Sequence, residues 1–307
     1  MRESPRRSLN SPAVTQTESS EWTIRRVLDW TTGYLRRGKV DAARFEAEVL
    51  LSHALRVERL ELYLHPERLL RPPERARFRE LVRQRHAGTP LAYLLGTVEF
   101  MNVTLKVNCS TLIPRVETEE MVERILRDVP SPLPKDFRFL DLGTGSGAIA
   151  IALAKEWPEA RALAVDISNE ALTLARENAQ QNGVAERVAF ACSDWFSAAQ
   201  GQYHLIVSNP PYIPSEDLGA LPQEVSAHEP RKALDGGPRG LREIERIVRE
   251  ASGFLLPGGR LYLEIGSPQA EDVCKLLHET PAFSRIEVHQ DLAGRDRIVY
   301  AIRRGDP

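Results

Sequence analysis

The chain has 307 residues, 42% of them hydrophobic and 27% charged, with a net charge of −2, which is a composition typical of globular proteins. No apolar run approaches the ~18 residues of a membrane-spanning helix, and no apolar secretory signal stands at the N-terminus. The three cysteines are scattered and the histidines lack ligand spacing, so we expect a cytoplasmic protein without disulfides, a metal site or a membrane anchor.

The first 90 residues predict a leader followed by a helical domain. Residues 1–20 are polar, rich in Ser, Thr and Pro, and without hydrophobic period, which predicts a disordered leader. Residues 21–90 show helical periodicity and predict a small helical N-terminal domain. Residues 1–100 carry 18 basic and 13 acidic side chains, whereas residues 101–307 carry 23 and 30. The charge is therefore unevenly distributed, with the basic excess in the front domain.

One row of arginines in the front domain has two interpretations. Arg71, Arg75, Arg79 and Arg83 recur every four residues and share one face of a predicted helix. The row could be a solvated charged face. It could also be a docking surface for an acidic macromolecule, which would make residues 21–90 a substrate-docking domain.

The rest of the chain predicts a linker and an α/β domain. Residues 96–113 alternate with period two, as in Val103, Leu105 and Val107, which predicts a β-hairpin linker over residues 91–116. From Phe137 onward strands alternate with helices, which predicts a mostly parallel sheet with helices on both faces in a domain of residues 117–307. In such sheets ligands bind beyond the carboxyl ends of the strands. Two unusual segments follow predicted strands, and we expect the functional site there.

The first of these segments is a glycine-rich turn. Asp141-Leu142-Gly143-Thr144-Gly145-Ser146-Gly147 follows a strand and opens a helix, so its glycines allow a tight turn and close approach of a ligand. Asp166, 19 residues beyond Gly147, ends the next strand, where a carboxylate can accept both hydroxyls of a ribose. A plain tight turn with an Asp helix cap is the structural alternative.

The identity of the nucleoside follows from spacing and charge. Dinucleotide sites have G-x-G-x-x-G, with a pyrophosphate on the helix N-terminus, whereas this turn reads G-x-G-x-G. Asp141 stands just before the turn and would repel a pyrophosphate, but it suits a ligand with an ammonium group. The residues therefore favour S-adenosylmethionine over NAD. After the third strand, Asp194 can accept from an adenine amine and Trp195 can cover the ring, unless Trp195 is ordinary core packing.

The second segment is Asn209-Pro210-Pro211-Tyr212, directly after the fourth strand. Neither proline has a backbone N–H, so the sheet ladder cannot continue. Asn209 Oδ1 and the Pro210 carbonyl can each accept one N–H of a planar –NH2 group, on which Tyr212 can stack. This arrangement suits attack on a sulfonium methyl by a weakly nucleophilic nitrogen, for which alignment supplies most of the acceleration. The alternative is a turn that only ends the strand.

These motifs together resemble a class I AdoMet-dependent methyltransferase that acts on amino groups, and more narrowly the release factor glutamine methyltransferases (the HemK/PrmC family). The Asn-Pro-Pro-Tyr motif alone is shared with DNA and RNA amine methyltransferases. The narrower resemblance rests on other segments, which are Gly88-Thr89-Pro90-Leu91-Ala92-Tyr93, Leu112-Ile113-Pro114-Arg115, Glu117-Thr118-Glu119, His228-Glu229-Pro230, Ala233-Leu234-Asp235-Gly236-Gly237 and Asp291-Leu292-Ala293-Gly294-Arg295-Asp296-Arg297. It covers the chain from about Trp22 onward. Val116 stands where the family usually has proline, which predicts a looser loop.

The resemblance implies methyl transfer from S-adenosylmethionine to the side-chain amide of the glutamine in the Gly-Gly-Gln motif of peptide chain release factors. It also implies a Rossmann-like, seven-stranded sheet. Carried over by motif, the donor-binding residues would be Asp141, Gly143, Thr144, Gly145, Ser146, Gly147, Asp166, Asp194, Trp195 and Asn209. The substrate-binding residues would be Asn209, Pro210, Pro211 and Tyr212, with Asn209, Pro210 and Tyr212 as the catalytic ones.

Several alternatives remain open at this point. A ribosomal protein glutamine methyltransferase would share almost every site residue. A DNA or RNA exocyclic-amine methyltransferase could use the same clamp for an –NH2 group, formed by Asn209, Pro210 and Tyr212. The pI of about 6.4 and the lack of a target-recognition domain disfavour nucleic acid, so we expect no sequence-specific binding to it, and a monomer. The intact glycine turn and Asn209 disfavour a non-catalytic AdoMet-binding regulator. Residues 213–240 predict either a lid or an ordinary crossover loop.

Overall fold

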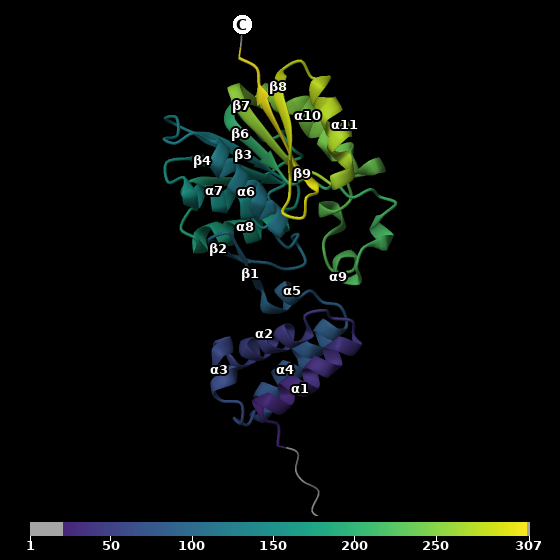
Figure 1. Cartoon of the computed structure of the whole chain (residues 1–307). Helices are drawn as coiled ribbons and strands as arrows, with labels where there is room; N and C mark the ends of the chain where they lie inside the picture. Colours follow the sequence, from purple (N-terminus) through teal and green to yellow (C-terminus); the bar gives the residue numbers. More distant parts are fainter. Residues whose placement is uncertain (1–20, 306–307) are drawn as a thin grey trace, which may run out of the picture. The chain divides into compact units, whose positions relative to one another are not determined.

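The computed structural model describes residues 21–305, and the chain divides into two compact units, Met1–His86 and Ala87–Pro307 (Figure 1). The predicted leader, residues 1–20, lies outside the described residues. The division falls close to the predicted end of the helical domain at residue 90. Within residues 21–305 every helix is too short or too polar to cross a membrane.

Unit 1 is helical, as its sequence pattern predicts. Its helices are α1 (Ile24–Arg37), α2 (Ala43–Leu55), α3 (Arg59–Leu64) and α4 (Pro72–His86). Thr23 caps α1 by accepting a hydrogen bond from the Arg26 N–H at 3.3 Å, and Pro72 begins α4, where its missing N–H costs nothing. The core is formed by buried apolar side chains of α1, α2 and α4, among them Leu28, Leu35, Leu50, Leu51, Phe78 and Val82.

The arginine row on α4 is less positive than its residues suggest. Arg71 pairs with Glu74 at 2.7 Å, and Arg83 pairs with Glu80 at 2.6 Å. Arg75 is half-buried, whereas Arg79 is exposed. Two of the four guanidinium groups, those of Arg71 and Arg83, therefore neutralise acids of α4.

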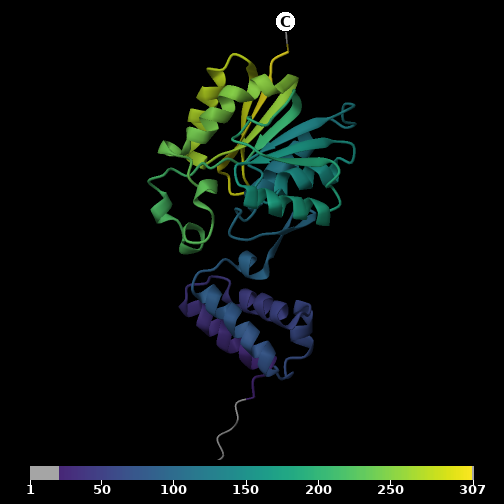
Figure 2. The same cartoon turned by 180° about the vertical axis from the view of Figure 1, so that it is seen from behind.

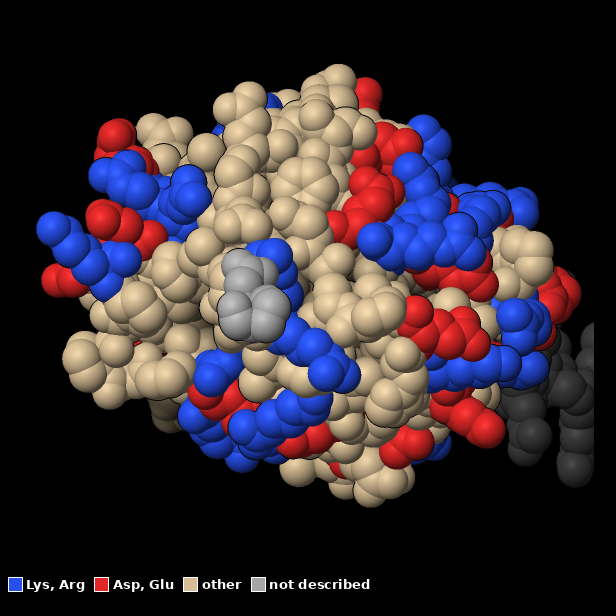
Figure 3. Space-filling model, turned by 90° about the horizontal axis from the view of Figure 1, so that it is seen from above, with Lys and Arg blue, Asp and Glu red and all other residues tan. Residues whose placement is uncertain are grey.

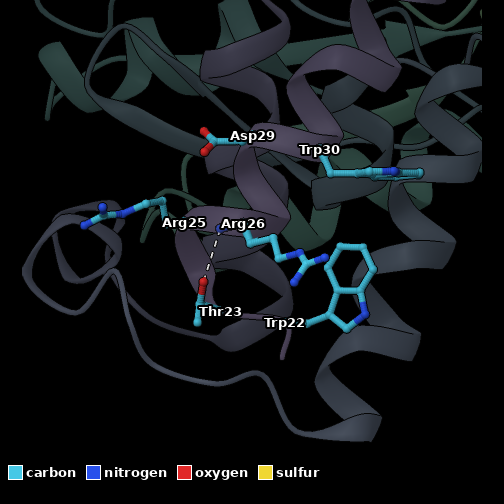
Figure 4. A pocket seen from close by; sticks show the side chains of 6 residues that line it. All are labelled: Trp22, Thr23, Arg25, Arg26, Asp29 and Trp30. Atoms are coloured by element: carbon cyan, nitrogen blue, oxygen red, sulfur yellow. Dashed lines mark hydrogen bonds between the residues drawn. The ribbon is translucent and has the colours of Figure 1, made fainter. Parts of the chain in front are cut away.

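A pocket of about 390 Å³ lies on unit 1, where α1 begins (Figure 4). The rings of Trp22 and Trp30 meet edge to face with centroids 6.4 Å apart, and Arg26 lies 5.3 Å from the Trp22 ring centroid. None of the residues predicted to bind the donor or the substrate amide lines this pocket. It is a surface feature of unit 1 and not the predicted site.

Unit 2 begins with the predicted hairpin. After α5 (Leu91–Leu95), β1 (Thr97–Phe100) and β2 (Val103–Lys106) pair antiparallel, with Val98 opposite Leu105. The hairpin of the predicted linker is therefore confirmed. Its inward residues Phe100, Val103 and Leu105 are buried in the core of unit 2.

A seven-stranded sheet forms the centre of unit 2, in the order β5-β4-β3-β6-β7-β9-β8. The first five strands in this order run parallel to one another. The strand β9 is antiparallel to both of its neighbours, β7 and β8. The strands are β3 (Arg138–Leu142), β4 (Arg161–Asp166), β5 (Val188–Cys192), β6 (Tyr203–Ser208), β7 (Leu255–Glu264), β8 (Phe283–Gln290) and β9 (Asp296–Arg303). The predicted α/β, Rossmann-like sheet is confirmed.

Helices cover both faces of this sheet (Figures 1 and 2). On one face lie α6 (Val116–Asp128), α7 (Ala148–Glu156) and α8 (Asn169–Gln181), and on the other lie α10 (Arg242–Phe254) and α11 (Ala270–His278). Successive residues of a strand point to opposite faces of the sheet. Phe139 packs in the core with α6 and α7, and Leu140 packs in the core with α10 and α11. Residues 213–240 form short helical turns, including α9 (Gln223–Ser226).

The strand order brings the two predicted motifs together. From β3 the chain runs outward through β4 to β5, and then returns to place β6 on the other side of β3. Leu142 of β3 lies opposite Ser208 of β6, so the glycine turn and Asn209 leave neighbouring strands. This reversal of order is the point where ligands bind in open α/β sheets.

Candidate active site

The glycine turn has the backbone conformation that its glycines predict. Gly143, Gly145 and Gly147 have φ values of +72°, +55° and +86°. A Cβ on Gly147 would lie 2.8 Å from Ile151 Cδ1, so this glycine serves close packing. No atom lies within 4 Å of a Cβ built on Gly145. The space beside Gly145 is therefore open for a ligand to approach the backbone.

Asp141 carries a buried oxygen without a partner. Its side chain is fully buried near the end of β3, and its Oδ2 accepts from the Thr144 hydroxyl at 2.6 Å and the Ala150 N–H at 3.2 Å. Its Oδ1 has no hydrogen-bond partner. Burial raises the pKa of Asp141 to about 7. Because an unsatisfied buried oxygen is costly, a ligand that donates hydrogen bonds, such as an ammonium group, fits this position.

Asp166 joins the end of β4 to the glycine turn. Its Oδ2 accepts from the Gly145 N–H at 2.8 Å and its Oδ1 from the Ser168 N–H at 2.9 Å. Burial raises the pKa of this carboxyl as well. Each oxygen has a second lone pair, which suits ribose hydroxyls. The next residue, Ile167, is large, apolar and 56% exposed, and sequence reasoning missed it as an apolar surface beside the predicted nucleoside site.

Trp195 is fixed against the glycine turn. Its Nε1 donates to Glu243 Oε2 at 2.8 Å, and its ring lies 3.4 Å from the position that a Cβ on Gly143 would take. Its φ is +49°, in the left-handed region that non-glycine residues seldom adopt. Asp194, predicted to accept from adenine, also pairs through Oδ2 with Arg246 at 2.8 Å. The structure thus brings the end of β5 to the turn after β3.

A hydrogen-bonded chain of four side chains surrounds the Asn-Pro-Pro-Tyr segment. Asn209 Nδ2 donates to Thr118 Oγ1 at 3.0 Å, and the Thr118 hydroxyl donates to Glu264 Oε2 at 2.6 Å. The Tyr212 hydroxyl donates to Glu264 Oε1 at 3.2 Å. Glu264 ends β7, is fully buried, and has its pKa raised to about 7 by burial. Since Asn209 uses its N–H toward Thr118, its Oδ1 is the atom left to accept from a substrate.

The backbone of this segment is held from a second side. Pro210 is buried, and the Tyr212 carbonyl accepts from Gln269 Nε2 at 2.8 Å. Gly240 lies so close that a Cβ there would be 1.9 Å from the same carbonyl oxygen. Ile213 pairs with the segment before Gly240, donating to the Leu234 carbonyl at 3.0 Å. The kink predicted from the two prolines is therefore braced by residues far along the chain.

Thr118, Glu264 and Gln269 are site residues that sequence reasoning did not assign. Glu264 gave a signal, because an acid inside the apolar stretch Leu261–Ile265 demands a partner. Thr118 gave none beyond its place in the quoted Glu-Thr-Glu segment. Nearby, Arg115 pairs with Glu229 at 2.5 Å and Val116 occupies the first position of α6. Arg115 is therefore anchored by an ion pair, directly before the position where Val116 replaces the usual proline of the family.

This sheet order, with a glycine turn and acids after β3 and β4 and an Asn-Pro-Pro-Tyr segment after β6, defines an AdoMet-dependent methyltransferase. A family model described as "Methyltransferase small domain" matches residues 123–225, and one described as "PrmC N-terminal domain" matches residues 26–96. Two solved structures share the fold. They are the catalytic domain of hMettl16 (TM-score 0.53, 14% identity, 78% of this chain and 86% of that chain) and the 16S rRNA N2 G1207 methyltransferase of Thermus thermophilus (TM-score 0.50, 17%, 68% and 50%).

The chain belongs to the release factor glutamine methyltransferase family. It is 46% identical over 284 residues to the release factor glutamine methyltransferase of Geobacter sulfurreducens, covering 92% of this chain and 98% of that relative. It is 44% identical to the one of Moorella thermoacetica, covering 92% and 99%, and 40% identical to the one of Nitratidesulfovibrio vulgaris, covering 93% and 97%.

Proposed function

We propose that this enzyme transfers a methyl group from S-adenosylmethionine to the side-chain amide nitrogen of the glutamine in the Gly-Gly-Gln motif of peptide chain release factors. The observation that carries the proposal is the orientation of Asn209. Its amide nitrogen is engaged by Thr118, which leaves its carbonyl oxygen to accept from an –NH2 group. Membership of the release factor glutamine methyltransferase family supports a release factor glutamine as the substrate.

The donor would be held by residues of β3, β4 and β5 and the turns after them. Asp141, with its unpartnered Oδ1, suits the ammonium of the donor, and the open space beside Gly145 leaves room for its tail. Asp166 suits the ribose, while Asp194 and Trp195 suit the adenine. When bound, S-adenosylmethionine supplies its methyl group as an electrophile on a sulfonium sulfur.

The substrate amide would be held by the Asn209–Tyr212 segment. Asn209 Oδ1 and the Pro210 carbonyl would each accept one amide N–H, with Pro211 fixing the loop and Tyr212 packing on the flat amide. An amide nitrogen is a poor nucleophile, so positioning supplies most of the acceleration. The two acceptors also favour the positive charge that develops on the nitrogen before it loses a proton.

Other substrates of the same chemistry are a ribosomal protein glutamine and an exocyclic amine of a nucleic acid. The surface around the C-terminal end of the described chain has basic and acidic side chains interspersed rather than a continuous basic area (Figure 3). This face lies at the end of the sheet away from Glu264, since Arg260 of β7 pairs with Ile302 and Glu264 with Ile298, so it does not report on the substrate. The pI of about 6.4 supports a protein substrate over sequence-specific nucleic-acid binding. Cys109 and Cys192 are exposed free thiols, which supports a reducing cytoplasm. A monomer remains our expectation, which sedimentation would test.

Mass spectrometry tests the substrate and the clamp together. Release factor, ribosomal protein and duplex DNA are each incubated with the enzyme and isotope-labelled S-adenosylmethionine. We expect one labelled methyl on the Gly-Gly-Gln peptide, and with Asn209→Ala a loss of at least about 100-fold in rate with nearly unchanged donor affinity. Label on DNA or ribosomal protein instead would refute the substrate. Donor affinity lost in proportion to rate would refute the role of Asn209.

We also propose that unit 1 docks the protein substrate through the exposed part of the α4 arginine row. Arg79 is exposed, so Arg79→Glu should raise the KM for release factor a few-fold and leave kcat unchanged. Arg249→Glu on α10 of unit 2 makes the same change in net charge and serves as the control. Equal KM values for the two variants would contradict docking through Arg79 and would favour the interpretation of the arginine row as a solvated charged face.

A further inference from the structure

Glu264 is buried at the site and has no surface open to a ligand. Its Oε2 accepts from Thr118 at 2.6 Å and its Oε1 from Tyr212 at 3.2 Å, and the side chain has no exposed surface. Both oxygens are therefore committed within the protein. Any effect of Glu264 on the substrate that is carried by hydrogen bonds passes through Thr118 or Tyr212.

The hydroxyl of Thr118 transmits the state of Glu264 to Asn209. A carboxylate can only accept, so the single hydrogen of Thr118 points at Glu264. The oxygen of Thr118 must then accept from its other neighbour, which fixes Asn209 with its Nδ2 inward and its Oδ1 outward. A protonated Glu264 could instead donate to Thr118. The Thr118 hydrogen could then turn to Asn209 Oδ1, and a reversed amide would present –NH2 to a substrate –NH2.

We propose that Glu264 is a positioning residue for methyl transfer, whose ionised carboxylate, acting through Thr118, keeps the carbonyl oxygen of Asn209 turned toward the substrate amide. This inference rests on the proposed function, because it takes Asn209 as the acceptor of the substrate N–H. Glu264 itself touches no reacting atom. Its role is to remove the second orientation of the Asn209 side chain.

The surroundings of Glu264 make its effect on the orientation of Asn209 depend on pH. Burial is the main cause that raises its pKa to about 7, and Glu117 of α6 adds to the increase. Arg297 of β9 and the hydroxyls of Thr118 and Tyr212 oppose it. Burial raises the pKa of Tyr212 as well, so its phenol stays protonated and donates. As pH falls through about 7, Glu264 takes up a proton and the constraint on Asn209 is lost.

The first experiment measures the single-turnover rate of release factor methylation against pH, with donor saturating so that titration of Asp141 does not enter. The wild-type rate should fall about tenfold per pH unit below about pH 7. Glu264→Gln is neutral at every pH and can still hydrogen-bond both hydroxyls, so its rate should lose this acidic limb. A limb that persists in Glu264→Gln with the same midpoint overturns the proposal.

The second experiment changes the intermediary. Thr118→Val removes the hydroxyl that orients Asn209, so kcat should fall about 10–100-fold while donor Kd stays within twofold. Thr118→Ser restores a hydroxyl and should recover most of kcat. Equal loss in both variants, or loss of donor affinity and Tm in parallel with kcat, would indicate a structural role and overturn the proposal.

The two proposals fail in distinguishable ways. If wild-type enzyme places no methyl on the Gly-Gly-Gln peptide, the proposed function fails, whatever the Glu264 variant does. If wild-type enzyme methylates that peptide and Glu264→Gln keeps the acidic limb, only the positioning role of Glu264 fails.

Discussion

Two buried carboxyl groups lie in neighbouring parts of one sheet edge and are used differently. Asp141 near the end of β3 and Glu264 at the end of β7 are both fully buried, and burial raises the pKa of each to about 7. Asp141 keeps one oxygen without a partner, whereas both oxygens of Glu264 accept hydrogen bonds from hydroxyls. In the site that we propose, the donor side would therefore keep an unpartnered acceptor for the ligand. The carboxyl group on the amide side would instead fix the neighbours that meet the ligand.

The largest effect that would test this contrast is on donor affinity. In the proposed site Asp141 faces the donor ammonium, and Asp141→Asn removes its charge. A charged hydrogen bond contributes about 1.5–3 kcal/mol, so donor Kd should rise about 10–100-fold. Glu264→Gln should leave donor Kd within twofold. Isothermal titration of both variants measures this. Equal weakening of donor binding by both substitutions would contradict the proposal that only Asp141 contacts the donor.

The same contrast predicts a proton released on donor binding. With its pKa raised to about 7, Asp141 is roughly half protonated at pH 7, and an ammonium beside it favours the ionised form. Binding should therefore release up to about half a proton, measured by calorimetry in buffers of different ionisation enthalpy. Asp141→Asn should abolish this release and Glu264→Gln should preserve it. Release that disappears only in the Glu264 variant would reverse the assignment.

A smaller effect separates ligand contact from backbone strain on the donor side. Gly145 and Gly183 have φ values of +55° and +74°, and neither has an atom within 4 Å of an added Cβ. Alanine at either position should lower the free energy of unfolding by about 1–2 kcal/mol, measured by urea denaturation. Only Gly145→Ala should also weaken donor binding, because Gly145 lies in the donor turn and Gly183 follows α8. Equal donor Kd values in the two variants would show that the space beside Gly145 is not used.

The sequence by itself determined the local features of this protein. Period-two and helical patterns predicted the helical front, the hairpin and the α/β sheet, because periodicity reports which residues of an element face a core. The glycine turn and the paired prolines identified both motifs, since these residues restrict the backbone wherever they stand. The arginine row was visible, but its pairing with Glu74 and Glu80 reduced the charge that the sequence suggested.

Only the tertiary structure decided how those motifs are oriented. Asn209 meets Thr118 across 91 residues, and Thr118 meets Glu264 across 146. Trp195 likewise finds Glu243 across 48 residues. Such contacts depend on how α6 and α10 pack on the sheet and on the strand order that places β7 beside β6. Spacing along a sequence does not contain that information, because a hydrogen bond between distant elements exists only where packing brings donor and acceptor within about 3 Å.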